Sequence, residues 1–403
     1  MKNKKILIFS LTYYPKHVGG AEVAIKEITD RILPKDIEFH MITNWFDSTL
    51  PKEEKIGNVF VHRMGLKKEN PQMADLRKFP LHLNKFLYQF SAPLYAYKLN
   101  KKYKFDGMWG MMAHSTAVPL AISKFLIPKM PYVLTLQEGD PIPHIMKKAK
   151  PVLPLFKQGF KKATIIQPIS TFLGKWARNM GFEGSIELVP NAVNTKHFSQ
   201  DFSEEELNKL KEKLGKKENE KYVITTSRLV KKNAVDDVIK ALPMLPENIK
   251  FVILGIGPDE KILKILAKEK GVQNRVMFLG QVNHSEMPKY LKISDIFIRP
   301  SLSEGFGNSF VEAMATDLPV IATQEGGIAD FLFDPDRNKE KKPTGLAVDP
   351  KSPEQIAKQI KRFLEDKELA EKIKENAKKM AIEKYDWNLI AKNMKKRVFA
   401  KLF

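Results

Sequence analysis

Cysteine is absent from this 403-residue sequence. Disulfides, thiolate metal sites and cysteine nucleophiles are therefore excluded within the chain. No uninterrupted apolar run reaches the ~18 residues that a transmembrane helix needs. The apolar start, K-I-L-I-F-S at 5–10, is soon interrupted by Tyr13, Tyr14, Pro15 and Lys16, and no small-residue cleavage site follows. We therefore expect a first strand and not a signal peptide, and a cytoplasmic protein.

Acidic residues are also scarce, because 47 Asp and Glu stand against 68 Lys and Arg, a formal net charge of +21. Residues 1–190 hold 29 basic and 15 acidic residues, so two thirds of the excess lies in the first half. Such asymmetry indicates nucleic acid, an anionic membrane or an acidic ligand, although a lysine-rich solvated surface gives the same count. No nucleic-acid-binding motif accompanies the charge, so we expect no nucleic-acid partner.

Short apolar segments alternate with helix-like segments along the whole chain. This alternation predicts an α/β fold in which helices cover both faces of parallel sheets. The expected strands are residues 5–10, 37–43, 58–63, 131–136, 164–169, 221–227, 250–255, 276–280, 295–300 and 319–323.

A highly charged segment indicates where one domain ends and the next begins. N-A-V-N-T-K-H-F at 191–198 is followed by a run rich in Glu and Lys, and a new strand starts near residue 221. We expect an N-terminal domain at 1–195 and a C-terminal domain at 196–385, both doubly wound and Rossmann-like. Because ligands bind at the carboxyl ends of the strands in such sheets, the crevice between two facing domains is the expected site.

The stretch E-G-F-G-N-S-F-V-E at 304–312 combines a flexible loop with two carboxylates. It follows an expected strand and opens an expected helix near Asn308. Glycines let the backbone approach a ligand, and a helix N-terminus attracts anions such as phosphate. Glu304 and Glu312 are suited to accept hydrogen bonds from sugar hydroxyls. The segment therefore indicates a nucleotide-sugar site, or else a strand–helix loop with capping glutamates.

Within S-E-G-F-G-N-S-F-V-E-A-M-A, the E-x7-E spacing resembles the signature of the retaining glycosyltransferases of family 4, which have the GT-B fold. D-L-P-V-I-A-T-Q-E-G-G-I-A-D, which follows this signature, also fits that family. Three further segments resemble family motifs in the same order. They are the glycine loop Y-Y-P-K-H-V-G-G-A-E (13–22), V-P-N-A-V-N-T-K-H-F (189–198) and the basic loop S-R-L-V-K-K-N-A-V-D-D-V-I (227–239).

The resemblance implies a role for each motif residue of the C-terminal domain. Glu304 would contact donor-sugar hydroxyls, and Glu312 would hold the ribose. Arg228 and Lys232 would grip the diphosphate, where fixed cations stabilise the charge that develops on the leaving group. The family often has lysine where Asn233 stands, so the cation could instead be Lys231. The backbone that would line the sugar and diphosphate belongs to Gly305, Phe306, Gly307 and Asn308.

In the N-terminal domain, the motifs are less regular. Gly19 and Gly20 would face the donor diphosphate or the acceptor, or would only start a helix. Relatives often carry a sugar-contacting histidine near His114, although Met111 occupies its expected place. His114 is therefore a catalytic candidate or a helix-start residue without sugar contact. Weaker acceptor-side candidates follow the next strand, and they are Gln137, Glu138 and Asp140.

G-I-G-P-D-E at 255–260 lacks the third glycine of a dinucleotide fingerprint, and we interpret it as a tight turn near the nucleotide. The expected ligands are a UDP- or GDP-sugar donor and a glycan or lipid-linked acceptor, with no other cofactor and no metal. Family membership implies retention of configuration, and we favour attack from the leaving-group face. The alternatives are a nucleotide-sugar epimerase or phosphorylase of the same fold, and a non-catalytic homologue that binds anionic membrane.

Two basic segments account for much of the N-terminal charge. Residues 77–104 hold seven Lys/Arg, seven Phe/Tyr and no acidic residue, and residues 141–182 hold eight Lys/Arg and no acidic residue. Aromatic residues among cations suit a membrane interface, where each basic residue contributes ~1 kcal/mol at an anionic surface. Peripheral attachment to the inner leaflet is one interpretation, and core aromatics with lysines on outer faces are the other.

The C-terminal segment 384–400 predicts an amphipathic helix, because Trp387, Ile390, Met394 and Val398 recur at helical spacing. By analogy with GT-B enzymes, we expect residues from about 386 to 403 to pack back on the N-terminal domain.

Overall fold

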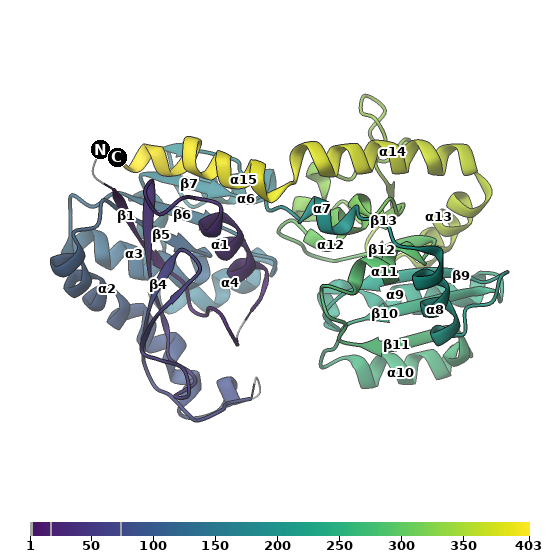
Figure 1. The fold of residues 1–403 in the computed structure, drawn as a ribbon, viewed down its shortest axis with the longest axis horizontal. Helices are drawn as coiled ribbons and strands as arrows, with labels where there is room; N and C mark the ends of the chain where they lie inside the picture. Colours follow the sequence, from purple (N-terminus) through teal and green to yellow (C-terminus); the bar gives the residue numbers. More distant parts are fainter. Residues whose placement is uncertain (1–2, 17, 73–74) are drawn as a thin grey trace. The chain divides into compact units, whose positions relative to one another are not determined.

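The computed structural model describes residues 3–16, 18–72 and 75–403, and the chain forms two compact units (Figure 1). Unit 1 comprises residues 1–191 and 387–403, and unit 2 comprises residues 192–386. Residues 192–195, which we expected in the N-terminal domain, belong to unit 2, where Val193 pairs with Asp386. His17 of the glycine-loop motif lies outside the described residues. In the described ranges, no helix is apolar enough over a sufficient length to span a membrane.

Unit 1 is built on an eight-stranded sheet with the order β3-β4-β2-β1-β5-β6-β7-β8. All neighbours are parallel except β3 and β4. The chain adds β2 to β4 on one side of β1 and β5 to β8 on the other, so the winding reverses between β1 and β5. The strands are β1 (Lys4–Phe9), β2 (Ile37–Asn44), β3 (Glu53–Ile56), β4 (Val59–Met64), β5 (Gly107–Met111), β6 (Tyr132–Leu136), β7 (Ile165–Pro168) and β8 (Ser185–Ile186).

Helices cover both faces of this sheet, and glycines in β5 show how closely the covering segments approach the strand. A Cβ atom on Gly110 would lie 2.4 Å from the side chain of Leu120 in α3, and one on Gly107 would lie 2.9 Å from Leu402. Residues three apart in a strand point to opposite faces, so α3 and the C-terminal segment lie on opposite sides. The helices are α1 (Gly20–Asp30), α2 (Asn84–Tyr103), α3 (Ala113–Leu126), α4 (Ile142–Ala149), α5 (Leu153–Lys161), α6 (Thr171–Asn179) and α15 (Trp387–Asn393).

The C-terminal segment is not the single α-helix that we expected. α15 ends at Asn393, a π-helical turn follows at Met394–Val398, and a 3-10 turn closes the chain at Phe399–Leu402. In a regular α-helix, Phe399 would lie about 100° from Val398 and leave the buried face. The wider π turn brings Phe399 inward, where its ring lies 5.0 Å from Trp109 and 5.7 Å from Phe39.

Unit 2 contains a six-stranded, fully parallel sheet with the order β11-β10-β9-β12-β13-β14. Its winding reverses between β9 and β12. The strands are β9 (Lys221–Thr226), β10 (Ile249–Leu254), β11 (Val276–Gly280), β12 (Ile296–Arg299), β13 (Val320–Ala322) and β14 (Leu346–Ala347). The helices are α7 (Thr195–Phe198), α8 (Glu204–Leu214), α9 (Val235–Ala241), α10 (Glu260–Glu269), α11 (Met287–Lys292), α12 (Asn308–Ala315), α13 (Pro353–Glu365) and α14 (Lys367–Lys384).

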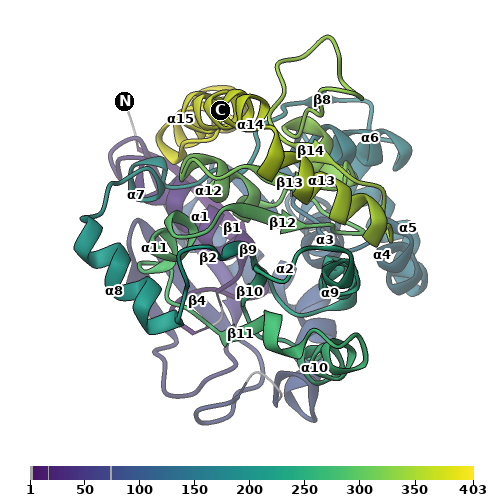
Figure 2. The same cartoon turned by 90° about the vertical axis from the view of Figure 1, so that its right-hand side faces the viewer.

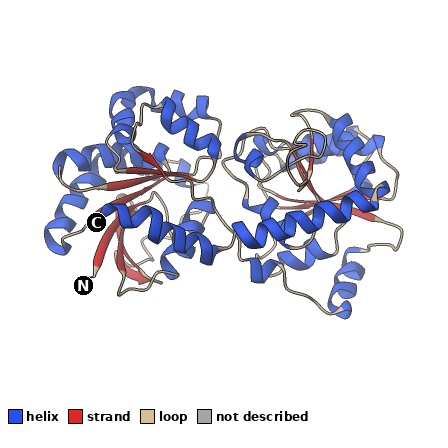
Figure 3. Ribbon diagram, turned by 90° about the horizontal axis from the view of Figure 1, so that it is seen from above, coloured by secondary structure: helices blue, strands red, loops and turns tan. Residues whose placement is uncertain are grey.

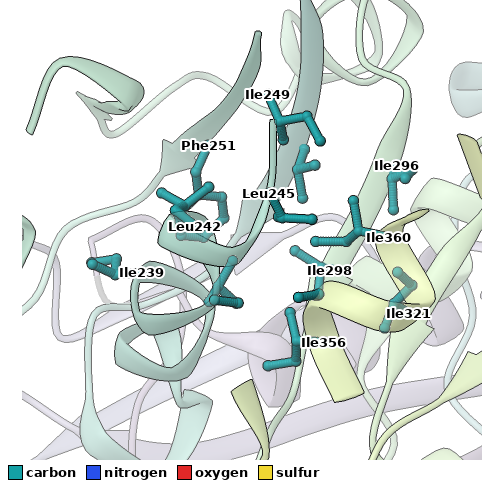
Figure 4. Close-up of a cluster of buried hydrophobic side chains, with 14 of the residues drawn as sticks. Ile239, Leu242, Leu245, Ile249, Phe251, Ile296, Ile298, Ile321, Ile356 and Ile360 are labelled. Atoms are coloured by element: carbon teal, nitrogen blue, oxygen red, sulfur yellow. The ribbon is translucent and has the colours of Figure 1, made fainter. Parts of the chain in front are cut away.

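The main core of unit 2 lies between this sheet and helices α9, α10 and α13 (Figure 4). Ile296 and Ile298 of β12 point into it, together with Ile239 of α9 and Ile356 of α13. Figure 2 shows α9, α10 and α13 on one side of the sheet and α8, α11 and α12 on the other. In Figure 3, the strands of each unit form a layer between helices. Both units are therefore three-layered α/β domains.

Candidate functional site

Two loops at the winding reversal of unit 2 carry most of the residues that we selected from the sequence of this unit. One loop follows β9 and contains Arg228 and Lys232, and the other follows β12 and contains Glu304. The loops are joined directly, because the backbone N–H of Leu302 donates to the Lys232 carbonyl at 2.7 Å. The carboxyl ends of the strands at such a reversal form the ligand crevice of doubly wound sheets.

A buried arginine that we did not select from the sequence organises this point. Arg299 ends β12, and the alternation of the strand places it on the α12 side with Phe297. Its guanidinium lies 3.0 Å from a Glu304 carboxylate oxygen and 4.4 Å from the centre of the Phe310 ring. Burial lowers the pKa of Arg299, and the carboxylates of Glu304 and Glu312 oppose that shift. Both glutamates therefore lie within the electrostatic reach of one buried cation.

Glycines and a buried aromatic ring fix the Glu304 loop. A Cβ atom on Gly326, whose φ is +62°, would lie 2.1 Å from the Glu304 carbonyl oxygen. The next residue, Gly327, donates its backbone N–H to that oxygen at 2.9 Å. Phe306 is buried, and its ring packs 5.2 Å from the rings of both Phe331 and Tyr385. Phe306 therefore anchors the loop with its side chain and can offer only backbone groups to a ligand.

Helix α12 begins at Asn308, as the motif predicted. Gly307 precedes it with a φ of +96° and provides no side-chain cap for the first backbone N–H groups. Those groups and the helix dipole favour an anion. Glu312, in the middle of this helix, lies 3.3 Å from Nε2 of His284, whose backbone carbonyl lies 3.0 Å from Nε2 of His197. We did not select His284, because it lies 28 residues from Glu312 in the chain and meets it only in the folded unit.

The basic loop shows why asparagine at position 233 is structural here. Asn233 is buried, and its side-chain amide donates to the Arg228 carbonyl at 2.7 Å. Arg228 and Lys231 are exposed, whereas Lys232 is half-buried. Cβ atoms on Gly255 and Gly257 would lie 1.9 Å and 2.1 Å from the carbonyl oxygens of Ser227 and Leu229. The 255–257 turn therefore supports the basic loop by close backbone contact.

Unit 1 has its own winding reversal, with loops after β1 and β5. Gly19 is the N-cap of α1, and its backbone N–H donates to Glu22 at 2.8 Å. Glu22 also accepts from the Thr12 hydroxyl at 2.5 Å, so this unselected glutamate holds the glycine loop. A Cβ atom on Gly20 would lie 3.8 Å from the side-chain amide nitrogen of Gln137, so these two selected residues are neighbours.

Glu138 is buried, and its carboxylate accepts hydrogen bonds from neighbouring backbone groups. Its carboxylate accepts from the backbone N–H groups of His114 at 3.1 Å and Gln137 at 2.9 Å. Nδ1 of His114 lies 3.6 Å from the same carboxylate, and the His114 side chain is 41% exposed. Met111 is buried in β5, whereas Asp140 is exposed. Of this group, His114 and Asp140 are the side chains that a ligand can reach most directly.

Residues 207–380 match the family model described as glycosyl transferases group 1. An uncharacterized glycosyltransferase, MJ1607 of Methanocaldococcus jannaschii, is 34% identical over 52% of this chain and 53% of its own length. A GDP-mannose-dependent alpha-(1-6)-phosphatidylinositol monomannoside mannosyltransferase of Mycobacterium tuberculosis is 28% identical over 60% of this chain and 64% of its own. This chain therefore spans between about half and two thirds of the length of these two relatives.

Among solved structures, Anabaena Alr3699/HepE in complex with UDP and glucose is similar over nearly all of the chain. The TM-score is 0.75 with 20% identity, and the match covers 99% of this chain and 100% of the other. A likeness at this identity concerns the fold. The chain thus has the GT-B fold, and its residues 207–380 are similar to the glycosyl transferases group 1 family.

Proposed function

We propose that the chain is a retaining glycosyltransferase of family 4 that uses a UDP- or GDP-sugar. The observation that carries the proposal is the hydrogen bond that joins the loop of Arg228 and Lys232 to the loop of Glu304 at the winding reversal of unit 2. At the same point, the buried Arg299 lies within the electrostatic influence of both Glu304 and Glu312. The Mycobacterium relative is named as GDP-mannose-dependent, and the Anabaena structure holds UDP and glucose. These names support a nucleotide-sugar donor, and the two names differ in the nucleotide base.

Within this proposal, basic groups bind the diphosphate of the donor and carboxylates bind its hydroxyl groups. Arg228 and Lys232 bind the diphosphate, together with the first backbone N–H groups of α12. Glu304 accepts hydrogen bonds from the sugar hydroxyls, and Glu312 accepts them from the ribose. The Arg299 side chain orients Glu304, because it ends 3.0 Å from that carboxylate.

The reaction follows from those contacts. The bond between the anomeric carbon and the phosphate oxygen breaks, and the nucleoside diphosphate leaves with the electron pair. Arg228 and Lys232 stabilise the negative charge that develops on it. The acceptor oxygen forms its bond on the face that the diphosphate leaves, which preserves the configuration. The acceptor proton passes to the departing phosphate oxygen, so no protein nucleophile is required.

We assign the acceptor to the winding reversal of unit 1. His114 is the candidate to contact the transferred sugar, since its ring is partly exposed at the start of α3. Gly19 and Gly20 present backbone groups at the start of α1, beside Gln137. Glu138 acts there as a positioning residue for the His114 backbone. The Mycobacterium relative is named for a lipid acceptor, which supports a lipid-linked or glycan acceptor here.

The test is to incubate the full chain with a panel of UDP- and GDP-sugars without acceptor. We expect one donor to raise the melting temperature and to be hydrolysed slowly to nucleoside diphosphate and free sugar with the same anomeric configuration. Arg228→Ala should abolish both signals while folding normally. An isomerised nucleotide sugar would indicate an epimerase, and no stabilisation by any nucleotide would contradict donor binding altogether.

A further inference from the structure

Helix α2 carries an apolar stripe on its outer face. Phe86, Leu87, Phe90, Leu94 and Tyr97, which we call the α2 stripe, are all exposed, with Phe86 at 62% and Leu94 at 57%. At about 100° per residue, these five positions fall within an arc of roughly 100°. They therefore form one continuous apolar band along the helix.

The opposite face of α2 already satisfies the packing of the helix. Tyr88, Ala92, Ala96 and Leu99 are buried, and the Tyr88 hydroxyl donates to the Ile42 carbonyl of β2 at 2.9 Å. The α2 stripe is thus additional to the core contact and not part of it. Single exposed apolar residues are ordinary, but a contiguous exposed band indicates an interaction surface.

Lysines border the α2 stripe without any carboxylate of the same segment. Lys98 and Lys101 are exposed near its C-terminal end, Lys85 lies at its start, and residues 77–104 contain no acidic residue. Nζ of Lys101 lies 4.6 Å from the centre of the Tyr97 ring. Just before the helix, Phe79 is 80% exposed. Aromatic rings beside cations match the headgroup region of an anionic bilayer.

We propose that the α2 stripe inserts into the surface of an anionic membrane, with Lys98 and Lys101 at the headgroups. A second copy of the chain fits the surface less well. A two-fold symmetric contact would set the same patch against itself, and these lysines would then face lysines with no carboxylate from residues 77–104 between them. The inference rests on this surface and does not depend on the proposed sugar transfer.

The test is sedimentation of the full chain with sucrose-loaded vesicles in the absence of any nucleotide sugar. One vesicle is pure phosphatidylcholine, and the other contains roughly 30% phosphatidylglycerol, an anionic content that attracts basic segments. We expect binding to the anionic vesicle that weakens with salt and little binding to the neutral one. Phe86→Ser/Phe90→Ser should weaken anionic binding by at least about tenfold, because two half-exposed rings lose their insertion.

The matched control is Ile262→Ser/Ile265→Ser, which removes two exposed isoleucines at 66% and 47% from α10 of unit 2. This variant should bind anionic vesicles like the wild type. Lys98→Glu/Lys101→Glu should lose the preference for anionic lipid. Equal binding of the phenylalanine variant and the wild type would overturn the proposal. A lipid-free dimer that Phe86→Ser/Phe90→Ser converts to a monomer, seen by light scattering, would also overturn it and assign the stripe to a second copy.

Discussion

The guanidinium of Arg299 lies 3.0 Å from the carboxylate of Glu304, and both side chains are largely withdrawn from water at 9% and 14% exposure. The cation sits at the end of a strand and the anion in the following loop, so the pair connects the sheet to the candidate donor site. A buried pair of this kind is costly to break from one side. Its two residues should therefore affect stability and activity unequally.

Arg299→Met should lower the free energy of unfolding of unit 2 by about 3–5 kcal/mol, because Glu304 would keep a buried charge without its partner. Glu304→Gln should cost less, since its amide oxygen still accepts from Arg299, but it should reduce donor turnover roughly 10- to 100-fold. All four tryptophans lie in unit 1, namely Trp45, Trp109, Trp176 and Trp387. Circular dichroism should therefore detect the loss while tryptophan fluorescence reports an unchanged unit 1. Wild-type unfolding of Arg299→Met would contradict this role.

Lys232 and Lys231 form a matched pair for locating the diphosphate contact. The Lys232 backbone is held against the Glu304 loop by Leu302, whereas the adjacent Lys231 side chain is exposed. Lys232→Ala should weaken nucleoside diphosphate binding by about 10- to 100-fold, the worth of a hydrogen bond to a charged group. Lys231→Ala should change it less than about threefold. Titration calorimetry measures both, and the reverse order would move the contact to Lys231.

Gly326→Ala should disable the donor site, and Gly271→Ala is its control. Both glycines have left-handed backbone angles, with φ of +62° and +69°. Alanine there costs each protein about 1 kcal/mol of stability. Only at Gly326 would the new methyl also meet the Glu304 carbonyl oxygen, at 2.1 Å, whereas nothing lies within 4 Å at Gly271. If Gly326→Ala binds nucleotide as Gly271→Ala does, the loop is not held in this way.

Two buried histidines that pack against α2 should make the stability of unit 1 depend on pH. Nδ1 of His40 lies 3.0 Å from Nε2 of His62, and their outer nitrogens lie 2.9 Å from Glu38 and 3.1 Å from Glu53. Burial lowers the pKa of both histidines. At His40, Lys5 lowers the pKa further and Glu38 opposes the shift. At His62, Lys102 lowers the pKa further and Glu53 opposes the shift. The rings of Tyr95 and Tyr103 from α2 also pack against the pair.

Because these pKa values are lower in the folded chain, the unfolded chain takes up protons more readily. The contribution is complete above the ordinary histidine pKa of about 6.5 and declines as the pH falls below it. Unfolding followed by tryptophan fluorescence should therefore show wild-type stability falling between pH 7 and about pH 5.5. His40→Gln/His62→Gln should flatten this dependence, and the exposed His82→Gln should not. A wild-type stability that does not change between pH 7 and about pH 5.5 would contradict this role of the two histidines.

Much of the Glu304 loop could be predicted from the sequence because its signals are local. The helix start at Asn308 follows from glycine and the apolar positions after it, and the strand before it is a short apolar run. Arg299 could not be selected that way. Its burial depends on Phe310 and on the Thr226 carbonyl, 3.4 Å from it, and neither neighbour is visible from the arginine's own segment.

The aromatic residues of 77–104 show the same limit. From the sequence, these residues could belong either to the core or to a membrane interface. The structure places some of them in the core and exposes others. Tyr88 is buried and Tyr103 packs on His40, while Phe86 and Phe90 are exposed. Which face points inward depends on where α2 packs on the sheet. Pro93 within the helix also obscures its periodicity.

In the proposed function, unit 2 binds a nucleoside diphosphate between cations and carboxylates. Its most direct test is calorimetric titration of the full chain and of Arg228→Ala with UDP and with GDP. We expect one of the two nucleotides to bind wild-type protein in a one-to-one ratio and to bind Arg228→Ala at least about tenfold more weakly. Binding of neither nucleotide, or equal binding to both proteins, would contradict the account.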